Sequence, residues 1–363
     1  MNKRDNIYMK FFNIDQHVSV IADIAHIFNN LGHEVDDWSL SGHHWVLNKP
    51  KPKIMLSDGT QLTCSGVCSQ EVCDKFYEQN KDELDKYDAF ITCYPTEFAL
   101  LYEKWNKPII VVNCIRYDHP NTFNPSIRDR LNLFLQEKVQ AGKLYYICNN
   151  KGDQYYTQYF TGITGMLIPN LCEYTNAKYT GTKNKFVIHD RSEITMPGNL
   201  CVSLGAIRSS SWKYTWQDLY SYKGIIHIPY NNGSMSMFEQ YTANVPLFLP
   251  SKKYTKELFQ QNKIFSDLTF YKINNVKEPD DINNPNSLRN PEVLDKWIDA
   301  CDFYDTENMK HVQYFDSPEH LEHLLNTVNT NEISHNMSNH NILRRESTYA
   351  RWKEIITSIE SQK

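Results

Sequence analysis

The sequence lacks the short motifs that mark several large enzyme classes. It contains no Gly-x-Gly-x-x-Gly, no Gly-x-x-x-x-Gly-Lys-[Ser/Thr] and no Gly-x-Ser-x-Gly. These motifs form the dinucleotide turn of dehydrogenases, the phosphate loop of P-loop enzymes and the nucleophile elbow of hydrolases, respectively. Their absence counts against all three classes.

Basic charge, close cysteine pairs and long apolar runs are also scarce. The formal net charge is −5, whereas a chain that neutralises nucleic-acid phosphates needs a strongly basic face. The nine cysteines include no Cys-x-x-Cys pair, so we expect reduced thiols rather than a zinc or redox motif. No apolar run approaches the ~18 residues of a membrane span, and the first residues lack a signal-peptide layout. We therefore expect a cytoplasmic protein without a membrane span.

The composition indicates a globular chain of about two domains. Of its 363 residues, 40% are hydrophobic and 22% are charged, and domains usually contain ~100–200 residues. In the first half, segments with the spacing of strands alternate with segments with the spacing of helices. We expect strands at 6–12, 33–40, 87–95, 107–115 and 143–150, and helices at 18–32, 97–105 and 126–142. Such alternation is typical of βαβ crossovers and a mostly parallel sheet.

The second half repeats this alternation less regularly. We expect strands at 184–190, 200–207, 223–230, 245–251 and 310–316, and helices at 236–243, 256–263, 317–328 and 346–360. The polar stretch 173–185 between the halves has the composition of a linker. We therefore predict an α/β protein with two Rossmann-like domains, whose mostly parallel sheets face a central cleft. The expected domains are 1–172 and 183–345, and the terminal helix, 346–363, packs back on the first domain.

One stretch, 223–254, combines an apolar strand, a turn of small polar residues and a short amphipathic helix. Parallel sheets bind ligands at the carboxyl ends of their strands. Small residues at Gly233, Ser234 and Ser236 allow backbone N–H groups to approach an anion, and the helix dipole favours negative charge there. Glu239, further along the helix, is suited to bind a pair of ribose hydroxyls. A second interpretation stays open, because Ser236 and Glu239 also have the spacing of a capping box.

Residues 225–251 resemble the nucleotide-sugar motif of GT-B fold glycosyltransferases: a strand, a small-residue loop, a helix with a carboxylate, and an apolar strand ending in Pro-Ser. The resemblance implies transfer of a sugar from a nucleoside-diphosphate donor, of UDP or GDP type, to a hydroxyl of a glycan or other acceptor held by the first domain. It implies no other cofactor, and the absence of any Asp-x-Asp motif agrees with a metal-independent enzyme.

The resemblance also suggests roles for individual residues of the second domain. It places the ribose on Glu239 and the diphosphate on Gly233, Ser234 and Ser236, and it suggests added positive charge from Arg208 and Lys213. The single glutamate, where retaining enzymes have two, leaves the stereochemical course open.

Catalysis in such an enzyme requires a base on the first domain. His17 follows the first expected strand and opens the first helix, with Asp15 nearby, and an imidazole is suited to accept a hydroxyl proton. His17 could alternatively only cap the helix. Weaker candidates for the acceptor side follow other expected strands, namely His43, His44, Asp118 and His119.

Three other functions are compatible with the same architecture. A nucleotide-sugar epimerase could use the same fold, and so could a two-domain binding protein for a small ligand. A carbohydrate-binding protein that has lost its chemistry is the third. A nucleic-acid acceptor is disfavoured by the acidic charge balance.

Overall fold

The structure is a computed structural model with two compact units. It describes residues 8–47, 54–59, 61–62, 68–121, 124–189, 203–209, 213–261, 264, 283–285, 287 and 290–363. The first unit contains residues 1–149, 153–170 and 348–363, and the second contains 150–152 and 171–347. Each unit is built around its own sheet, so the two units are described in turn.

The first unit is built on a six-stranded parallel sheet. Its strands are β1 (Lys10–Asn13), β2 (Glu34–Asp37), β3 (Ala89–Thr92), β4 (Ile109–Asn113), β5 (Leu144–Cys148) and β6 (Met166–Leu167). They lie in the order β2-β1-β3-β4-β5-β6. Strand β2 pairs with one edge of β1, and β3 pairs with the other edge. The direction in which successive strands are added to the sheet therefore reverses between β1 and β3. Such a reversal opens a crevice at the carboxyl ends of the two strands, where doubly wound proteins bind ligands.

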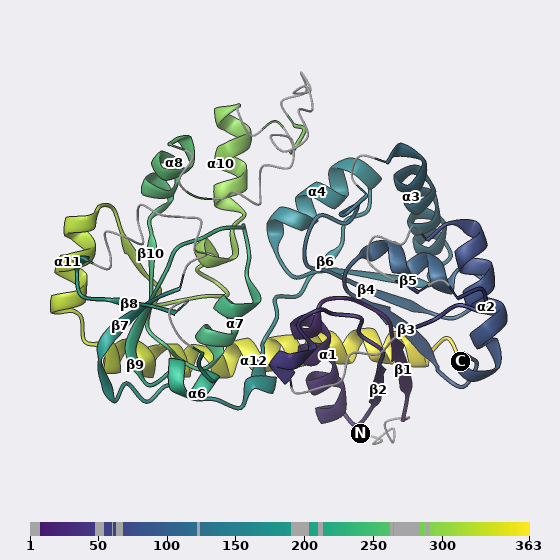
Figure 1. Ribbon diagram of the computed structural model, residues 1–363, viewed down its shortest axis with the longest axis horizontal. Helices are drawn as coiled ribbons and strands as arrows, with labels where there is room; N and C mark the ends of the chain where they lie inside the picture. Colours follow the sequence, from purple (N-terminus) through teal and green to yellow (C-terminus); the bar gives the residue numbers. More distant parts are fainter. Residues whose placement is uncertain are drawn as a thin grey trace. The chain divides into compact units, whose positions relative to one another are not determined.

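The helices of this unit cover both faces of its sheet. They are α1 (Val18–Asn30), η1 (His44–Leu47), α2 (Gln70–Leu84), η2 (Thr96–Tyr102), α3 (Pro125–Gln140) and α4 (Lys151–Thr161). Figure 1 shows α1 and the last turns of α12 (Thr330–Glu360) on one side of the sheet, and α3 and α4 on the other. The ring of Trp352 on α12 packs 5.4 Å from that of Phe28 on α1. The terminal turns of the chain therefore belong to this core.

A buried tyrosine connects the chain after β1 to the centre of the sheet. Tyr102 is stacked on Phe90 of β3, with ring centroids 4.4 Å apart. Its hydroxyl accepts a hydrogen bond from the N–H of Ile14 and donates one to the carbonyl of Ile91, both at 3.0 Å. Because Ile14 directly precedes Asp15, this hydroxyl helps to hold the backbone that positions the candidate catalytic residues.

Replacing Tyr102 by phenylalanine is expected to destabilise the first unit by about 1–3 kcal/mol, because the Ile14 N–H would be left buried without its acceptor. Chemical denaturation followed by circular dichroism measures this loss. Tyr145→Phe is the matched control: its hydroxyl bonds Ser358 at an exposed site, so we expect a change within about 0.5 kcal/mol. Equal effects of the two substitutions would contradict a structural role for the Tyr102 hydroxyl.

The second unit contains a five-stranded parallel sheet with the same topology. Its strands are β7 (Lys183–His189), β8 (Ile207–Arg208), β9 (Tyr222–His227), β10 (Leu247–Pro250) and β11 (Gln313–Phe315), in the order β11-β10-β9-β7-β8. Read in chain order, this arrangement repeats that of the first five strands of the first sheet. Its reversal therefore lies between β7 and β9. Two all-parallel sheets confirm the predicted α/β fold class.

Short helices connect the strands of the second unit. They are η3 (Glu173–Thr175), α6 (Trp216–Leu219), α7 (Met235–Thr242), α8 (Lys252–Gln260), α10 (Pro291–Asp299), η6 (Asp302–Tyr304) and α11 (Pro318–Thr327), followed by α12. Ser317 caps α11 as predicted, because its hydroxyl accepts the N–H of His320. In Figure 1, α8 and α10 lie side by side next to β10.

Three expectations about individual segments were inaccurate. Of the strand expected at 200–207, residues 200–202 lie outside the described residues, and among residues 203–207 only Ile207 joins a strand, β8, because Gly205 adopts a turn conformation at φ +83°. The helix expected at 97–105 is the tighter 3₁₀ helix η2. The expected linker at 173–185 contains η3 and the start of β7. None of the helices within the described residues is long and apolar enough to cross a membrane.

Candidate functional site

In the first unit, Asp15 and His17 lie at the reversal of strand order. Both follow β1, and His17 is the N-cap residue of α1. The carbonyl of Asp15 accepts the N–H of Leu40, which follows β2. The structure thus places this predicted pair at the edge of the sheet where doubly wound folds bind ligands.

Asp15 is a fully buried carboxyl group. Burial, followed by repulsion from the Asp37 carboxylate, raises the pKa of Asp15 to about 7. The nearby polar groups of Ser39, Asn13 and the His17 backbone oppose this rise without cancelling it, and neither carboxylate oxygen has a hydrogen-bond partner among the described residues. At neutral pH, Asp15 therefore exchanges a proton in the range where acid–base catalysts work.

The imidazole of His17 is neutral at physiological pH. Burial, followed by the nearby His43, lowers the pKa of His17 to about 4. Its ring makes no capping hydrogen bond to α1, and its Nδ1 has no hydrogen-bond partner among the described residues. His17 thus occupies the capping position without capping the helix through its side chain. A neutral, unengaged imidazole can accept a proton.

We expect Asp15→Asn to change the pH dependence of stability. The native pKa of Asp15 is raised, so the native state holds more protons than the unfolded chain between about pH 4 and 7, and stability falls as the pH rises through that window. Asparagine removes this loss, so the stability of the variant relative to wild type should increase by about 2 kcal/mol from pH 5 to 7.

The measurement is urea denaturation at both pH values. The titration of His17 has the opposite sign, because its native pKa is lowered, but it occurs in both proteins and cancels in the difference. Asp82→Asn on the exposed face of α2 is the control and should show no such change. A pH-independent difference for Asp15→Asn would show that Asp15 titrates normally.

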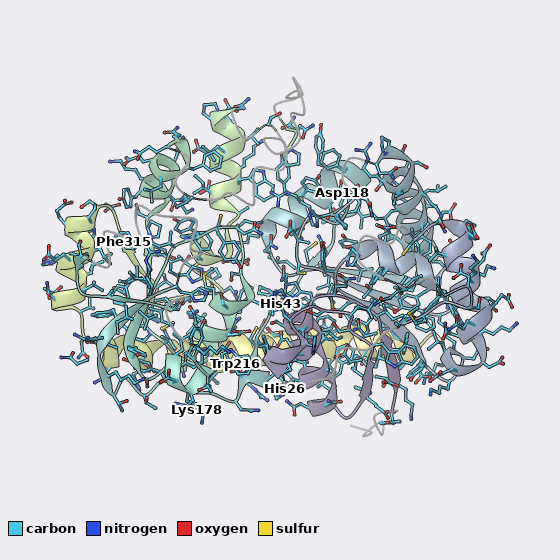
Figure 2. All side chains as sticks on the ribbon, in the orientation of Figure 1. His26, His43, Asp118, Lys178, Trp216 and Phe315 are labelled. Carbon is cyan, nitrogen blue, oxygen red and sulfur yellow. The ribbon has the colours of Figure 1, made fainter. Side chains whose placement is uncertain are left out.

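The acceptor-side candidates form two separate groups. His43 and His44 follow β2, where His43 is exposed and His44 Nδ1 lies 3.3 Å from the carbonyl of Ser41. Asp118 and His119 follow β4. Figure 2 shows Asp118 close to α4 and well apart from His43. Besides burial, the charge of His43 lowers the pKa of His17, so His43 of the first group lies near the catalytic pair.

In the second group Asp118 is buried and His119 is half-buried, and each is linked to its own neighbours. Burial raises the pKa of Asp118 to about 6, and its carboxyl accepts a 3.4 Å hydrogen bond from Tyr156 of α4. The buried guanidinium of Arg116 lies over the same tyrosine ring, 5.7 Å from its centroid. His119 Nδ1 lies 2.8 Å from the hydroxyl of Tyr94, which follows β3. Both residues thus line the carboxyl edge, in an arrangement that limits their freedom to reorient.

In the second unit, the structure excludes the capping-box interpretation. Helix α7 starts at Met235 with Ser234 as N-cap, so Ser236 is its second residue and Glu239 its fifth. The carboxylate of Glu239 does not reach back to the cap. It accepts hydrogen bonds from the Tyr174 hydroxyl and, at 3.1 Å, from the Trp216 indole N–H. Glu239 is thus held by two aromatic side chains in a site that is 8% exposed.

The loop before α7 presents hydroxyl groups and one neighbouring acid. The hydroxyls of Ser234 and Ser236 lie 2.6 Å apart, and that of Tyr230 lies 3.4 Å from Ser234. Gly233 packs against the buried Asp302, since a Cβ at this glycine would lie 2.3 Å from Asp302 Oδ2. The backbone therefore requires glycine here. The acid also places negative charge beside the expected diphosphate site.

The two cations suggested by the resemblance differ in position. Arg208 ends the edge strand β8, where it pairs with Ile188 of β7, and is half-buried. Lys213 is exposed, between β8 and α6. Arg208 thus lies at the carboxyl edge of the sheet, near the reversal of strand order. Lys213 belongs to no strand, so the sheet does not place it at this edge.

Two histidines at this reversal of strand order were not predicted as site residues from the sequence. His189 and His227 end β7 and β9, lie opposite each other in register, and stack with ring centroids 5.2 Å apart. His189 Nδ1 lies 3.3 Å from the hydroxyl of Ser209. Burial, followed by His189, lowers the pKa of His227 to about 3, so it is neutral. The signal was present, because both expected strands contain Ile-His towards their carboxyl ends.

The sequence contains no signal that identifies Tyr174 and Trp216 as partners of Glu239, because they lie 65 and 23 residues away from it in the chain. Figure 2 labels Trp216 at the start of α6.

A cavity of about 600 Å³ lies elsewhere in the first unit. It is located between β6 and the last turns of α12, and Met166, Ile168, Arg351, Glu354 and Ile355 contribute to its walls. No predicted site residue lines it. Within the described ranges, no three His, Cys, Asp or Glu residues are grouped so that they could hold a metal ion.

Solved structures of glycosyltransferases resemble this chain over nearly its full length. The glycotransferase of kitacinnamycin is 11% identical over 97% of this chain and 99% of its own, with a TM-score of 0.45. The glycosyltransferase SnogD from Streptomyces nogalater is 11% identical over 96% and 100%, with a TM-score of 0.42. The spinosyn rhamnosyltransferase SpnG, complexed with thymidine diphosphate, is 9% identical over 92% and 96%, with a TM-score of 0.40.

No known protein family matches the sequence, and no curated protein does. Because all three TM-scores lie below 0.5, we infer nothing about the site or the activity from these structures. The α/β class rests on the two parallel sheets themselves.

Proposed function

We propose that this protein is a glycosyltransferase that moves a sugar from a nucleoside-diphosphate donor to an acceptor hydroxyl without a metal ion. The observation that carries the proposal is the position of Glu239. This carboxylate lies on the helix that follows the reversal strand β9, does not cap that helix, and is held in one orientation by Tyr174 and Trp216. A fixed carboxylate at such a position is suited to bind vicinal ribose hydroxyls.

The second unit would hold the donor. The carboxylate of Glu239 accepts hydrogen bonds from Tyr174 and Trp216, and a carboxylate, which offers about four acceptor positions, is the group type that binds ribose hydroxyls. The start of α7 offers backbone N–H groups and the hydroxyls of Ser234 and Ser236 to the diphosphate, with Arg208 as the cation at the same sheet edge. Asp302 beside Gly233 opposes a full diphosphate charge there, so the added positive charge matters for binding.

The first unit would hold the acceptor and the base. In the proposed step, the acceptor oxygen forms a bond to the anomeric carbon, the bond from that carbon to the diphosphate oxygen breaks, and the hydroxyl proton passes to His17. Its neutral imidazole is ready to take this proton. Asp15, two residues before His17, would lie beside the base, and His43 lies close enough to act on the same ring. His44, Asp118 and His119 remain candidates for acceptor contacts.

A thermal-shift panel tests donor binding. The ligands are UDP, GDP, CMP, thymidine diphosphate, their common sugar conjugates and free sugars, each in the presence of EDTA. A ligand at one hundred times its dissociation constant adds about 2.7 kcal/mol of stability. We expect one nucleoside diphosphate to raise the melting temperature in EDTA. Stabilisation by a free sugar with none by any nucleotide would instead identify a sugar-binding protein.

A further inference from the structure

Two cysteines of the first unit lie against each other at the start of α2. Ser69 is the N-cap residue, so Cys68 precedes the cap and Cys73 is the fourth helical residue. Side chains at these two positions contact each other across the first turn of a helix. Here both residues are 1% exposed, and the Cys73 thiol donates a 3.7 Å hydrogen bond to the carbonyl of Cys68.

A guanidinium group binds both cysteines. Arg130 of α3 places Nη2 3.7 Å from Cys73 Sγ, and its Nη1 donates to the carbonyl of Cys68. The Cys68 thiol, followed by the Arg130 cation, lowers the pKa of Cys73. The hydrogen bond to Cys73, burial and the nearby Glu97 raise the pKa of Cys68. The two pKa shifts have opposite directions, so Cys73 loses its proton more readily than Cys68 does.

We propose that Cys68 and Cys73 form a reversible oxidation site that a hydroperoxide converts to a disulfide. The Cys73 thiolate attacks one peroxide oxygen, so an S–O bond forms, the O–O bond breaks, and hydroxide leaves and takes up the proton released by the thiol. The Cys68 sulfur then attacks the resulting sulfenic acid, an S–S bond forms and the S–O bond breaks, and water leaves. Two thiols lose two electrons and two protons, and hydrogen peroxide becomes two waters.

The guanidinium provides the route to the buried sulfur. The Arg130 side chain is 27% exposed and its partner Glu103, 2.8 Å away, is 19% exposed, whereas Cys73 is 1% exposed, so a small peroxide would reach Cys73 when the Arg130 side chain moves aside. The modification also affects a neighbouring segment. The Cys68 N–H donates at 2.7 Å to Glu97, whose other oxygen accepts from Asn121, two residues after His119. The proposed function is not needed for this inference.

The test treats the full-length protein with hydrogen peroxide, blocks free thiols with iodoacetamide and analyses the tryptic peptide 54–75 by mass spectrometry. This peptide contains Cys64, Cys68 and Cys73. We expect it to carry one alkyl group instead of three, with a Cys68–Cys73 disulfide that dithiothreitol reverses. Full alkylation after treatment, or a disulfide to Cys64, would overturn the proposal.

Four variants separate the roles of the groups. Cys64→Ser is the control and should keep the disulfide. Cys68→Ser should leave a sulfenic acid on Cys73 that reacts with dimedone, whereas Cys73→Ser should give no sulfenic acid at Cys68. Arg130→Met should slow disulfide formation by about tenfold, because the thiolate loses its cation. Sulfenic acid at Cys68 in Cys73→Ser, or an unchanged rate in Arg130→Met, would contradict the assigned roles.

Discussion

Replacing Glu239 by alanine is expected to abolish nucleotide binding, with the dissociation constant of the preferred nucleoside diphosphate rising by about a hundredfold or more. Hydrogen bonds to a charged group contribute about 1.5–3 kcal/mol each, and the proposal assigns two ribose hydroxyls to this carboxylate. Isothermal titration calorimetry measures the change. Alanine would also leave the Trp216 N–H without its acceptor, so some loss of stability accompanies the loss of binding.

Three further variants separate binding from folding. Glu239→Gln keeps the shape but turns one acceptor into a donor that faces Tyr174 or Trp216, so we expect binding between that of wild type and Glu239→Ala. Trp216→Phe removes one group that orients the carboxylate and should weaken binding less than Glu239→Ala does. Glu257→Ala, on the exposed face of α8, is the charge control. Unchanged nucleotide affinity in Glu239→Ala would show that the donor does not bind at this helix.

Replacing His17 by alanine is expected to lower sugar transfer by about 10²–10⁴-fold, the usual contribution of a positioned general base. Donor affinity should stay within about twofold, because the groups assigned to the donor belong to the second unit. Steady-state kinetics with titration of the nucleotide measures both quantities. The loss should appear in kcat, since the base acts on the reacting hydroxyl.

The pH profile supplies an independent check on His17. With its pKa lowered to about 4, the imidazole is neutral above about pH 5, so the rate should stay level there and fall on acidification through pH 4. His26→Ala, on the same helix, is the control and should retain wild-type kinetics. A wild-type kcat in His17→Ala would show that His17 only occupies the start of α1 and takes no part in the chemistry.

The fold class was predictable from the sequence because its signals are local. Apolar runs such as 107–115 and 223–230 became β4 and β9, and Gly32, at φ +89°, ends α1 as its position predicts. The prediction failed at 203–206, the described part of the expected strand that precedes β8. The left-handed turn at Gly205 interrupts the apolar run there, and Ile207–Arg208 pair with β7. An isolated glycine in a strand pattern often marks such an interruption.

The candidate site was predictable only where it follows the ends of strands. Asp15, His17 and the loop before α7 lie at the reversals of strand order, because alternating strands and helices imply parallel sheets with ligand crevices at that edge. The alternative capping box does not form, because α7 begins two residues earlier than a cap at Ser236 would require. The partners of Glu239 come from η3 and α6, and a single sequence contains no signal that joins such distant segments.

Release of the nucleoside diphosphate from a sugar nucleotide tests the central claim most directly. Wild type, Glu239→Ala and the Glu257→Ala control would be incubated in EDTA with each sugar conjugate and a panel of hydroxyl acceptors, and the released nucleotide quantified by chromatography. We predict release from one donor class by wild type and Glu257→Ala, and its loss in Glu239→Ala. Absence of release from every donor, together with stabilisation by a free sugar alone, would contradict a transferase and identify a binding protein.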